Sequence, residues 1–293
     1  MNARRLPPWI RIRLKTDGKY GLVQSLIDGH KLHTVCNSAH CPNQQECFNR
    51  GTATVMILGN ICTRSCRFCA VSSITAPRRM PEQVDRDEPR RVAELVQKLN
   101  LRHAVVTSVT RDDLPDGGAS IFAETILEIR RATEGRTTIE VLTPDFNGSE
   151  ESLAAVLSAG PDVFNHNLET VERLQSEVRP QADYHRSLAV LKFAAGSNEA
   201  GLIKSGLMVG LGETDEELFG AFEDLLEAEC KYLTIGQYLA PSEKHWPVKR
   251  FVNPGMFDEY KKQALALGFK GVASGPLVRS SYLAEQFLRQ QTQ

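Results

Sequence analysis

The chain has 293 residues, 41% of them hydrophobic, which is enough apolar material to bury a sizeable core in one main domain. Its formal net charge of -1 creates no overall field that would attract nucleic acid or a membrane surface. No apolar run approaches the roughly 18 to 20 residues needed to cross a bilayer, so we expect neither a membrane nor a nucleic-acid partner.

The amino-terminal fifteen residues are basic and carry no acidic side chain. The Pro7-Pro8 pair would break the amphipathic helix of a transit peptide, so we do not expect targeting to an organelle. A solvated tail and a basic arm that docks an acidic partner both stay open. The basic residues are Arg4, Arg5, Arg11, Arg13 and Lys15.

Six of the seven cysteines lie between residues 36 and 69, in two triplets of different spacing. The first is C-x4-C-x5-C and the second is C-x3-C-x2-C, which differs from both the paired C-x2-C of a zinc ribbon and the bacterial ferredoxin run. Three thiolates can hold three corners of a 4Fe-4S cluster and leave the fourth iron free. The triplets are Cys36, Cys41 and Cys47, then Cys62, Cys66 and Cys69.

The cysteines fit two simpler kinds of protein less well. A closed zinc site built from both triplets would strand two thiolates, and a simple ferredoxin would not need some two hundred further residues. The odd number of cysteines, without a secretory leader, indicates a reducing compartment in which thiolates bind metal. We therefore expect a cytoplasmic protein.

Short apolar runs alternate with helical patterns after residue 50, which predicts buried parallel strands with helices outside them. Right-handed crossovers should curl this sheet into a barrel or partial barrel. The predicted strands are Thr54–Leu58, Ala104–Val109, Thr138–Leu142, Asp162–Asn165, Gly206–Val209 and Tyr232–Gly236. The predicted helices are Pro89–Asn100, Ala119–Thr133 and Asp215–Glu229, the last with a capping box of Thr214 and Glu217.

Polar and glycine residues follow each predicted strand, as expected when chemistry gathers at the carboxyl ends of barrel strands. These loops begin at Gly59, Thr110, Pro144, Asn165, Gly210 and Gln237. The acidic residues of the second loop, Asp112, Asp113 and Asp116, have no assigned role beyond turn formation.

The second cysteine triplet resembles the signature loop of the radical S-adenosylmethionine (SAM) superfamily. The first triplet, joined to Arg111–Gly118, Pro144–Gly148 and the Arg-Ser-Ser-Tyr motif at residues 279–282, resembles the lipoyl synthases from about Pro8 to Leu283. The resemblance implies an α/β fold, a partial parallel (β/α)6 barrel at residues 51–267. An amino-terminal extension at 1–50 would carry auxiliary cluster ligands, and a carboxyl-terminal extension at 268–293 would carry the Arg-Ser-Ser-Tyr motif.

The resemblance also implies two 4Fe-4S clusters. One, on Cys62, Cys66 and Cys69, would bind SAM and generate a radical. The other, on Cys36, Cys41 and Cys47, would donate sulfur, with Ser281 as its fourth and weaker ligand. From the residues alone, Ser280-Ser281 is better explained as the cap of a helix at residues 282–290.

Contacts to SAM are predicted in three segments. The loop at residues 165–170 resembles the ribose-binding loop of biotin synthase, which implies roles for Asn167 and Glu169. A basic residue at Arg186 would meet the cofactor carboxylate. Gly210 and Gly212 would let the backbone approach adenosine, although a simple strand-to-helix turn explains them equally well.

The implied reaction is a sulfurtransferase step of lipoate biosynthesis and protein lipoylation. Sulfur would enter carbons six and eight of an octanoyl group on a lysine of a lipoyl carrier domain, with two molecules of SAM consumed. The carrier would be a 2-oxoacid dehydrogenase E2 subunit or the glycine cleavage H protein, and the electron donor a ferredoxin or flavodoxin. The rivals are another radical SAM enzyme, such as a tRNA-methylthiolating one, and a non-catalytic iron-sulfur electron carrier.

Cys230 is expected to be a buried small hydrophobe and Trp246 a packing residue.

Overall fold

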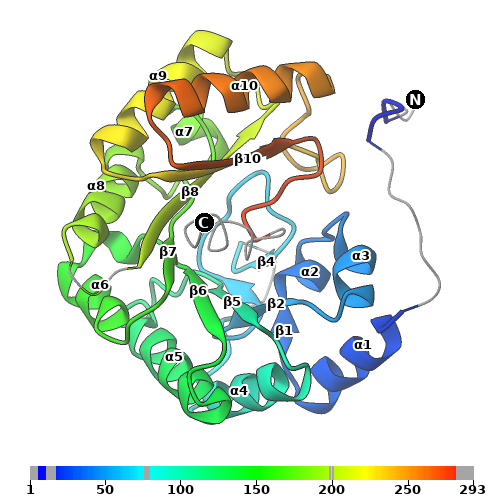
Figure 1. Ribbon diagram of the computed structural model, residues 1–293, viewed down its shortest axis with the longest axis vertical. Coiled ribbons are helices and arrows are strands. Elements are labelled where there is room, and N and C mark those ends of the chain that lie inside the picture. Colours follow the sequence, from blue (N-terminus) through cyan, green and yellow to red (C-terminus); the bar gives the residue numbers. More distant parts are fainter. Residues whose placement is uncertain (1–5, 11–17, 76–79, 198, 200, 282–293) are drawn as a thin grey trace.

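The computed structural model describes residues 6–10, 18–75, 80–197, 199 and 201–281. Its centre is one curved sheet with strands in the order β1-β2-β5-β6-β7-β8-β9-β10 (Figure 1). Every neighbouring pair is parallel except β1 with β2. The strands are β1 His33–Thr34, β2 Thr54–Ile57, β5 His103–Ser108, β6 Thr138–Leu142, β7 Val163–Asn165, β8 Leu202–Val209, β9 Tyr232–Gln237 and β10 Gly271–Gly275.

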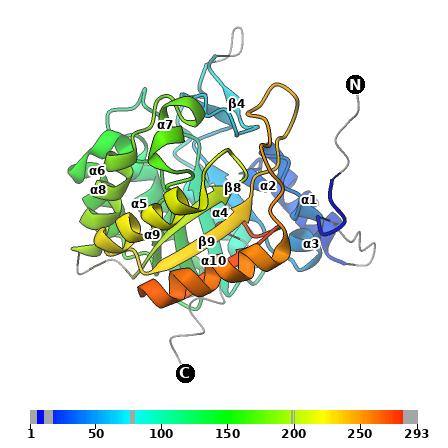
Figure 2. The same cartoon turned by 90° about the horizontal axis from the view of Figure 1, so that it is seen from above.

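Helices cover the outer face of this sheet, and a group of three lies to one side of the barrel (Figures 1 and 2). The outer helices are α4 Glu88–Lys98, α5 Ala119–Thr133, α6 Glu150–Leu157, α7 Glu172–Val178, α8 Tyr184–Ala195, α9 Asp215–Glu227 and α10 Pro254–Leu267. The side group is α1 Tyr20–Gly29, α2 Val35–Ser38 and α3 Gln44–Asn49, and a short 3-10 turn, η1, spans Phe146–Gly148. The predicted α/β partial barrel is confirmed, since the two edge strands do not pair with each other in the sheet order.

All six predicted strands are present, although β8 is longer than predicted, and one further strand, β10, was not predicted. Strand β8 begins at Leu202 instead of Gly206. Its first residues were not predicted because the polar pair Lys204 and Ser205 interrupts the apolar run, although both side chains are buried. Strand β10 adds a seventh parallel strand within residues 268–293. Its Gly-Val-Ala-Ser-Gly sequence has too few β-branched residues to be predicted as a strand.

The predicted helices form for the reasons that the sequence suggests. Helix α4 starts with Pro89 in its first turn and buries Val92, Leu95 and Val96 on one face. Helix α9 starts at the predicted capping box, in which the Thr214 hydroxyl accepts from the Glu217 amide and the Glu217 carboxylate accepts from the Thr214 amide. Each of these helices therefore begins within one residue of its predicted start.

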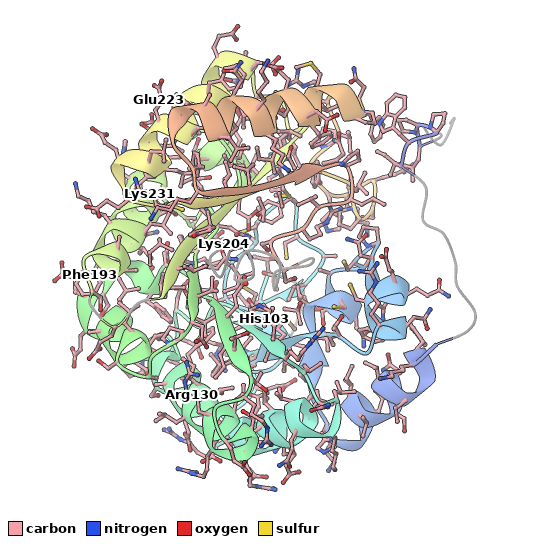
Figure 3. All side chains as sticks on the ribbon, viewed as in Figure 1. His103, Arg130, Phe193, Lys204, Glu223 and Lys231 are labelled. Atoms are coloured by element: carbon pink, nitrogen blue, oxygen red, sulfur yellow. The ribbon has the colours of Figure 1, made fainter. Side chains whose placement is uncertain are left out.

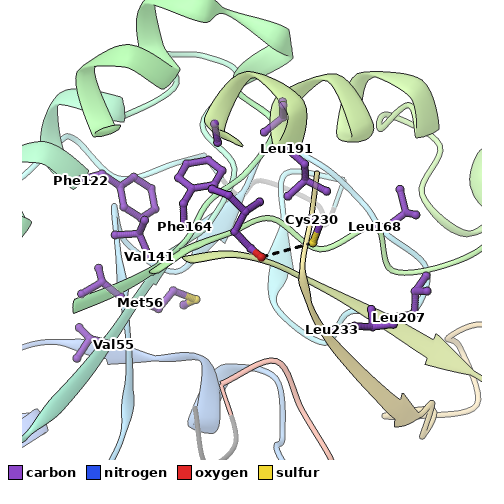
Figure 4. Close-up of a cluster of buried hydrophobic side chains, with 14 of the residues drawn as sticks. Val55, Met56, Phe122, Val141, Phe164, Leu168, Leu191, Leu207, Cys230 and Leu233 are labelled. Atoms are coloured by element: carbon purple, nitrogen blue, oxygen red, sulfur yellow. Dashed lines mark hydrogen bonds between the residues drawn. The ribbon is translucent and has the colours of Figure 1, made fainter. Parts of the chain in front are cut away.

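A cluster of buried apolar side chains lies between the sheet and its outer helices (Figure 4). Phe164 of β7 and Val141 of β6 have no exposed surface and pack with Leu191 of α8. Burying one such side chain stabilises the fold by about 1.5 to 3 kcal/mol. Cys230 is also fully buried, and its Sγ lies 3.7 Å from the Ile203 carbonyl oxygen, as expected for a small hydrophobe. Within the described residues, no helix has both the length and the apolar character needed to cross a bilayer.

Candidate active site

A cavity of about 940 Å³ occupies the interior of the barrel, and both cysteine triplets lie on its wall together with Ser280 and Ser281. Five of the six predicted loops also contribute to this wall, through Cys62, Thr110, Asp145, Asn167 and Tyr238 among others. The loop that begins at Gly210 does not. The expected gathering of loops at one end of the barrel is therefore largely observed. Figure 3 shows the side chains that fill the space around this interior.

The second triplet lies in the segment that follows β2: Cys62 ends the short strand β3 (Ile61–Cys62), and Cys66 and Cys69 lie between β3 and the short strand β4 (Ser72–Ser73). The Sγ of Cys62 accepts hydrogen bonds from the amides of Arg64 and Thr110, at 3.4 and 3.3 Å. Burial, together with the charges of the other two thiols, raises the pKa of Cys69 to about 12, and burial also raises the pKa of Cys66. Two buried thiols whose ionisation is disfavoured, Cys66 and Cys69, fit a site where bound metal supplies the compensating positive charge.

The first triplet lies in the helices and the turn beside the barrel. Cys36 lies in α2, Cys47 lies in α3, and Cys41 lies in the turn between them. The turn is closed by a 3.0 Å hydrogen bond from the Cys41 amide to the Cys36 carbonyl. Burial and the neighbouring thiols raise the pKa of Cys36 to about 11 and that of Cys47 to about 12. The donor set therefore suits a second iron-sulfur cluster.

In the part of the chain that the structure describes, no three His, Cys, Asp or Glu side chains are grouped to hold a single metal ion. A 4Fe-4S cluster poses a different requirement, because each cysteine binds its own iron and the sulfur atoms surround the cluster instead of meeting at one point.

Ser281 is brought to the cavity by a segment that enters the barrel after β10. The Asn43 amide donates to the Leu277 carbonyl at 2.7 Å, and the Lys204 ammonium donates to the Ser280 carbonyl at 2.6 Å. Gly236 of β9 permits this path, since a Cβ atom there would lie 2.2 Å from the Val278 carbonyl oxygen. The helix expected at residues 282–290, and with it the capping role of Ser280-Ser281, lies outside the described residues.

Asn167 and Glu169 both lie on the cavity wall, after β7. The Asn167 amide donates to the Glu169 carboxylate at 3.0 Å, and the Asn167 Oδ1 has no hydrogen-bond partner among the described residues. Burial raises the pKa of Glu169. These groups offer acceptors to a ligand that carries hydroxyl groups, as a ribose does.

Arg179 is a wall residue that the sequence analysis missed. Its guanidinium donates through Nη1 to the carbonyls of Asn167 and Leu168, and its Nε has no partner among the described residues. Its positive charge lowers the pKa of Cys66 against the larger effect of burial, so it lies close to the second triplet. Its place in the polar stretch before α8 could have indicated a contact to the cofactor carboxylate. The sequence analysis assigned that contact to Arg186, seven residues later.

Arg186, Gly210 and Gly212 are not on the cavity wall. The Arg186 Nε donates to Asp145 at 2.9 Å, while the amides of both glycines donate to the Glu213 carboxylate. At Gly210, φ is +96° and a Cβ atom would lie 2.5 Å from the Arg250 carbonyl oxygen, so the turn itself needs glycine. A cofactor role for these three residues stays a prediction that no observed contact supports.

Comparison with known proteins shows the family. The model of the radical SAM superfamily matches residues 56–225. The lipoyl synthase of Caldanaerobacter subterraneus subsp. tengcongensis is 53% identical over 281 residues, which cover 96% of each chain. That of Geotalea uraniireducens is 52% identical over 287 residues, which cover 98% of this chain and 99% of the relative. The chain belongs to the lipoyl synthase family. It is accordingly a radical SAM enzyme of lipoate biosynthesis, as the sequence analysis predicted.

Solved structures confirm the fold of this lipoyl synthase family member. Methylornithine synthase (PylB) superposes with a TM-score of 0.55 at 13% identity, covering 92% of this chain and 82% of that chain. HydG, a maturase of the [FeFe]-hydrogenase, superposes with a TM-score of 0.54 at 14% identity, covering 79% and 58%. At these identities the likeness concerns the fold alone.

Arg64 fixes the cysteine loop of this radical SAM enzyme to two neighbouring loops. It is 5% exposed and bonds both carboxylate oxygens of Asp112 at 2.8 Å, with further contacts to Asp145 and Asn147 at 2.7 Å. Arg64, with His166 and Arg186 contributing, holds the pKa of the buried Asp145 far below its usual range despite burial. Asp112, whose role was open, is therefore a structural partner of the cluster loop.

The loop between β9 and α10 covers the same cysteine loop from the other side. The Trp246 amide donates to the Arg67 carbonyl at 2.8 Å, and the Arg67 guanidinium lies 4.5 Å from the centre of the Trp246 ring. A His245 ring nitrogen lies 3.1 Å from the Cys69 carbonyl oxygen. Trp246 is 7% exposed, which confirms it as a packing residue.

Proposed function

We propose that this protein inserts sulfur at carbons six and eight of an octanoyl group held in amide linkage to a lysine of a carrier protein, giving a lipoyl group. The observation that carries the proposal is the convergence of both cysteine triplets and Ser281 on one cavity inside the barrel. A single chamber lets the group that activates a carbon and the group that supplies sulfur reach the same substrate. The family of its relatives supports the same reaction.

The radical-generating end of the cavity would be formed by the second triplet. Cys62, Cys66 and Cys69 would hold a 4Fe-4S cluster, while Asn167 and Glu169 would orient SAM through its ribose. Arg179 offers its free Nε–H to the carboxylate of the cofactor. When bound, the cluster and SAM supply the radical chemistry that an unactivated C–H bond needs, since such a bond has no acidic proton for a base.

The sulfur-donating end would be formed by Cys36, Cys41, Cys47 and Ser281, as ligands of the auxiliary 4Fe-4S cluster. A serine oxygen is a harder ligand than a thiolate and holds iron less firmly. One weak corner suits a cluster that gives up its own sulfur. The chain therefore positions the sulfur source with three strong ligands and one that releases easily.

The cavity wall also has an apolar part that suits a saturated acyl chain. It includes Met56, Val105, Leu142 and Leu207, all on strands of the barrel. Apolar side chains exclude water and offer no hydrogen bond that a polar competitor could use. These residues would hold the octanoyl chain, with its target carbons presented between the two triplets.

The partners follow from this reaction. The substrate would be an octanoylated lipoyl domain of a 2-oxoacid dehydrogenase E2 subunit or of the glycine cleavage H protein, and the electron donor a ferredoxin or flavodoxin in the cytoplasm. Such carriers are usually acidic, so Arg4, Arg5, Arg11 and Arg13 would steer docking. These arginines lie outside the described residues, and neutralising them should weaken turnover and its dependence on salt.

The decisive experiment is anaerobic reconstitution, followed by iron and sulfide counts and incubation with SAM, reductant and an octanoyl-lysine peptide. Mass spectrometry should find the thiolated peptide. Replacing Cys36, Cys41 and Cys47 by Ser should abolish thiolation yet leave reductive SAM cleavage, whereas Cys230→Ala, a cysteine outside both triplets, should leave both. A single cluster in the wild-type protein, or undiminished thiolation by the triple variant, would refute the proposal. Absence of SAM cleavage would favour the electron-carrier rival.

A further inference from the structure

Two opposite charges are buried together beneath the cavity. The Lys204 ammonium of β8 donates to the Glu140 carboxylate of β6 at 2.8 Å, and their side chains are 1% and 0% exposed. The Asn165 amide donates to the same oxygen at 3.0 Å, and the His103 Nε2 lies 3.4 Å from the other oxygen. Figure 3 shows Lys204 and His103 at the centre of the barrel.

Stability alone does not explain why the barrel core contains this ion pair. Removing two charges from water costs several kcal/mol per ion, and apolar residues of similar volume would stabilise a barrel core at least as well. Although burial opposes ionisation, Lys204 and then His103 lower the pKa of Glu140 to about 2, so the carboxylate stays ionised at neutral pH. The core thus keeps an ammonium group fixed at one position.

Neither member of the pair lies on the cavity wall, so neither would touch substrate or cofactor. The Lys204 ammonium instead donates a second hydrogen bond to the Ser280 carbonyl, at 2.6 Å. Ser280 directly precedes Ser281, the only proposed cluster ligand that is not a cysteine. Three residues earlier, Asn43 holds the Leu277 carbonyl. The ligand-bearing segment is therefore fixed by one buried donor on each side of Val278 and Arg279.

We propose that Lys204, fixed by Glu140, is the positioning residue that presents Ser281 to the auxiliary cluster. This inference rests on the proposed function, since it takes Ser281 as the fourth ligand. A serine oxygen binds iron weakly, so it remains a ligand only if its backbone is held in place before the metal binds. Groups that orient a metal ligand commonly change metal affinity about 10- to 100-fold when they are removed.

The test compares reconstituted, full-length variants. Lys204→Met removes the ammonium but leaves the buried Glu140 carboxylate without its lysine partner, which threatens folding. The double variant Lys204→Met/Glu140→Leu removes both charges, a replacement that buried ion pairs usually tolerate. Ser281→Ala is the reference for loss of the ligand itself. Arg130→Met is the matched control, because it breaks an ion pair of 2.9 Å with Asp162 on the outer part of the barrel.

The primary measurement is the rate at which a chelator removes the most labile iron, followed by the Mössbauer signature of the remaining cluster. We expect the double variant to lose one iron about 10-fold faster than wild type, as Ser281→Ala does, while the cluster on Cys62, Cys66 and Cys69 still cleaves SAM. Arg130→Met should match wild type.

A folded double variant that keeps its iron like wild type, while Ser281→Ala loses it, would overturn the positioning role. Equal loss of iron from both clusters would also overturn it, since that result means general loosening of the core. If Ser281→Ala itself behaves like wild type, the ligand assignment in the proposed function fails, whatever Lys204 does.

Discussion

Arg64 should be among the most costly side chains to remove, because it joins three loops at one buried point. We consider Arg64→Leu. The Asp145 side chain has no exposed surface, and its Oδ1 lies 2.7 Å from the Arg64 Nη2. The substitution removes this contact and leaves Arg186 as the remaining salt-bridge partner of Asp145 among the described residues. Breaking a buried pair by removing one partner costs about 3 to 5 kcal/mol. The Asp112 contacts add less, since that carboxylate is 30% exposed.

Urea unfolding of the metal-free chain measures this loss. With a slope of about 3 kcal/mol per molar for a chain of this size, a loss of about 3 to 5 kcal/mol should lower the midpoint by about 1 to 1.7 M. Arg130→Leu is the control, because both sides of its pair with Asp162 are about one-third exposed, and it should cost about 1 kcal/mol or less.

A second substitution separates the lost attraction from the charge left behind. In Arg64→Leu/Asp145→Asn the carboxylate that lost its Arg64 partner is gone, so part of the stability should return, and the double-mutant cycle should give a coupling of at least about 1 kcal/mol. If Arg64→Leu lies within 1 kcal/mol of wild type, or if the two substitutions simply add, then the account of Arg64 as a buried junction is wrong.

Three further outcomes follow from the site and its surroundings. Arg179→Met should weaken SAM binding by about 10-fold or more, and more than Arg186→Met does, as measured by the SAM concentration dependence of cleavage at equal cluster content; the reverse order would restore the assignment of Arg186. Burial raises the pKa of Glu88 from 4.5 to about 7. The free energy of unfolding is therefore highest below pH 4.5 and falls by up to about 3 kcal/mol as the pH rises from 4.5 to 7. Glu88→Gln should flatten that part of the pH profile of urea unfolding, and an unchanged slope would contradict the shift. Gly210→Ala should cost more than about 2 kcal/mol in the same unfolding assay, because the turn needs φ of +96° and has no room for a Cβ atom; a loss of SAM binding without loss of stability would instead favour the predicted cofactor role.

Much of the site could be read from the sequence because its cysteines are close together along the chain. The spacing of Cys62, Cys66 and Cys69 already implied a three-thiolate loop, and the regular strands placed that loop at one end of a barrel. Asn167 and Glu169 were assigned from the resemblance of their loop to that of biotin synthase, and the structure places both on the cavity wall.

Contacts between distant segments could not be found in this way. The partners of Arg64 lie 48 and 81 residues further along the chain, in two different loops. Lys204 was overlooked because a charged residue inside a strand breaks the apolar pattern, and only its partner on β6 explains its burial. Arg179 and Arg186 lie in the same stretch of chain, so only their three-dimensional positions separate a wall residue from a structural one.

The hydrogen bond from Asn43 to the Leu277 carbonyl has a consequence for biosynthesis. Ribosomes release a chain from its amino end, and the barrel strands with the Cys62–Cys69 loop emerge long before residue 281 does. Cys36, Cys41 and Cys47 are therefore synthesised long before Ser281, the fourth ligand proposed for the sulfur-donating cluster. The complete set of ligands proposed for the sulfur-donating cluster therefore exists only when the chain is almost finished.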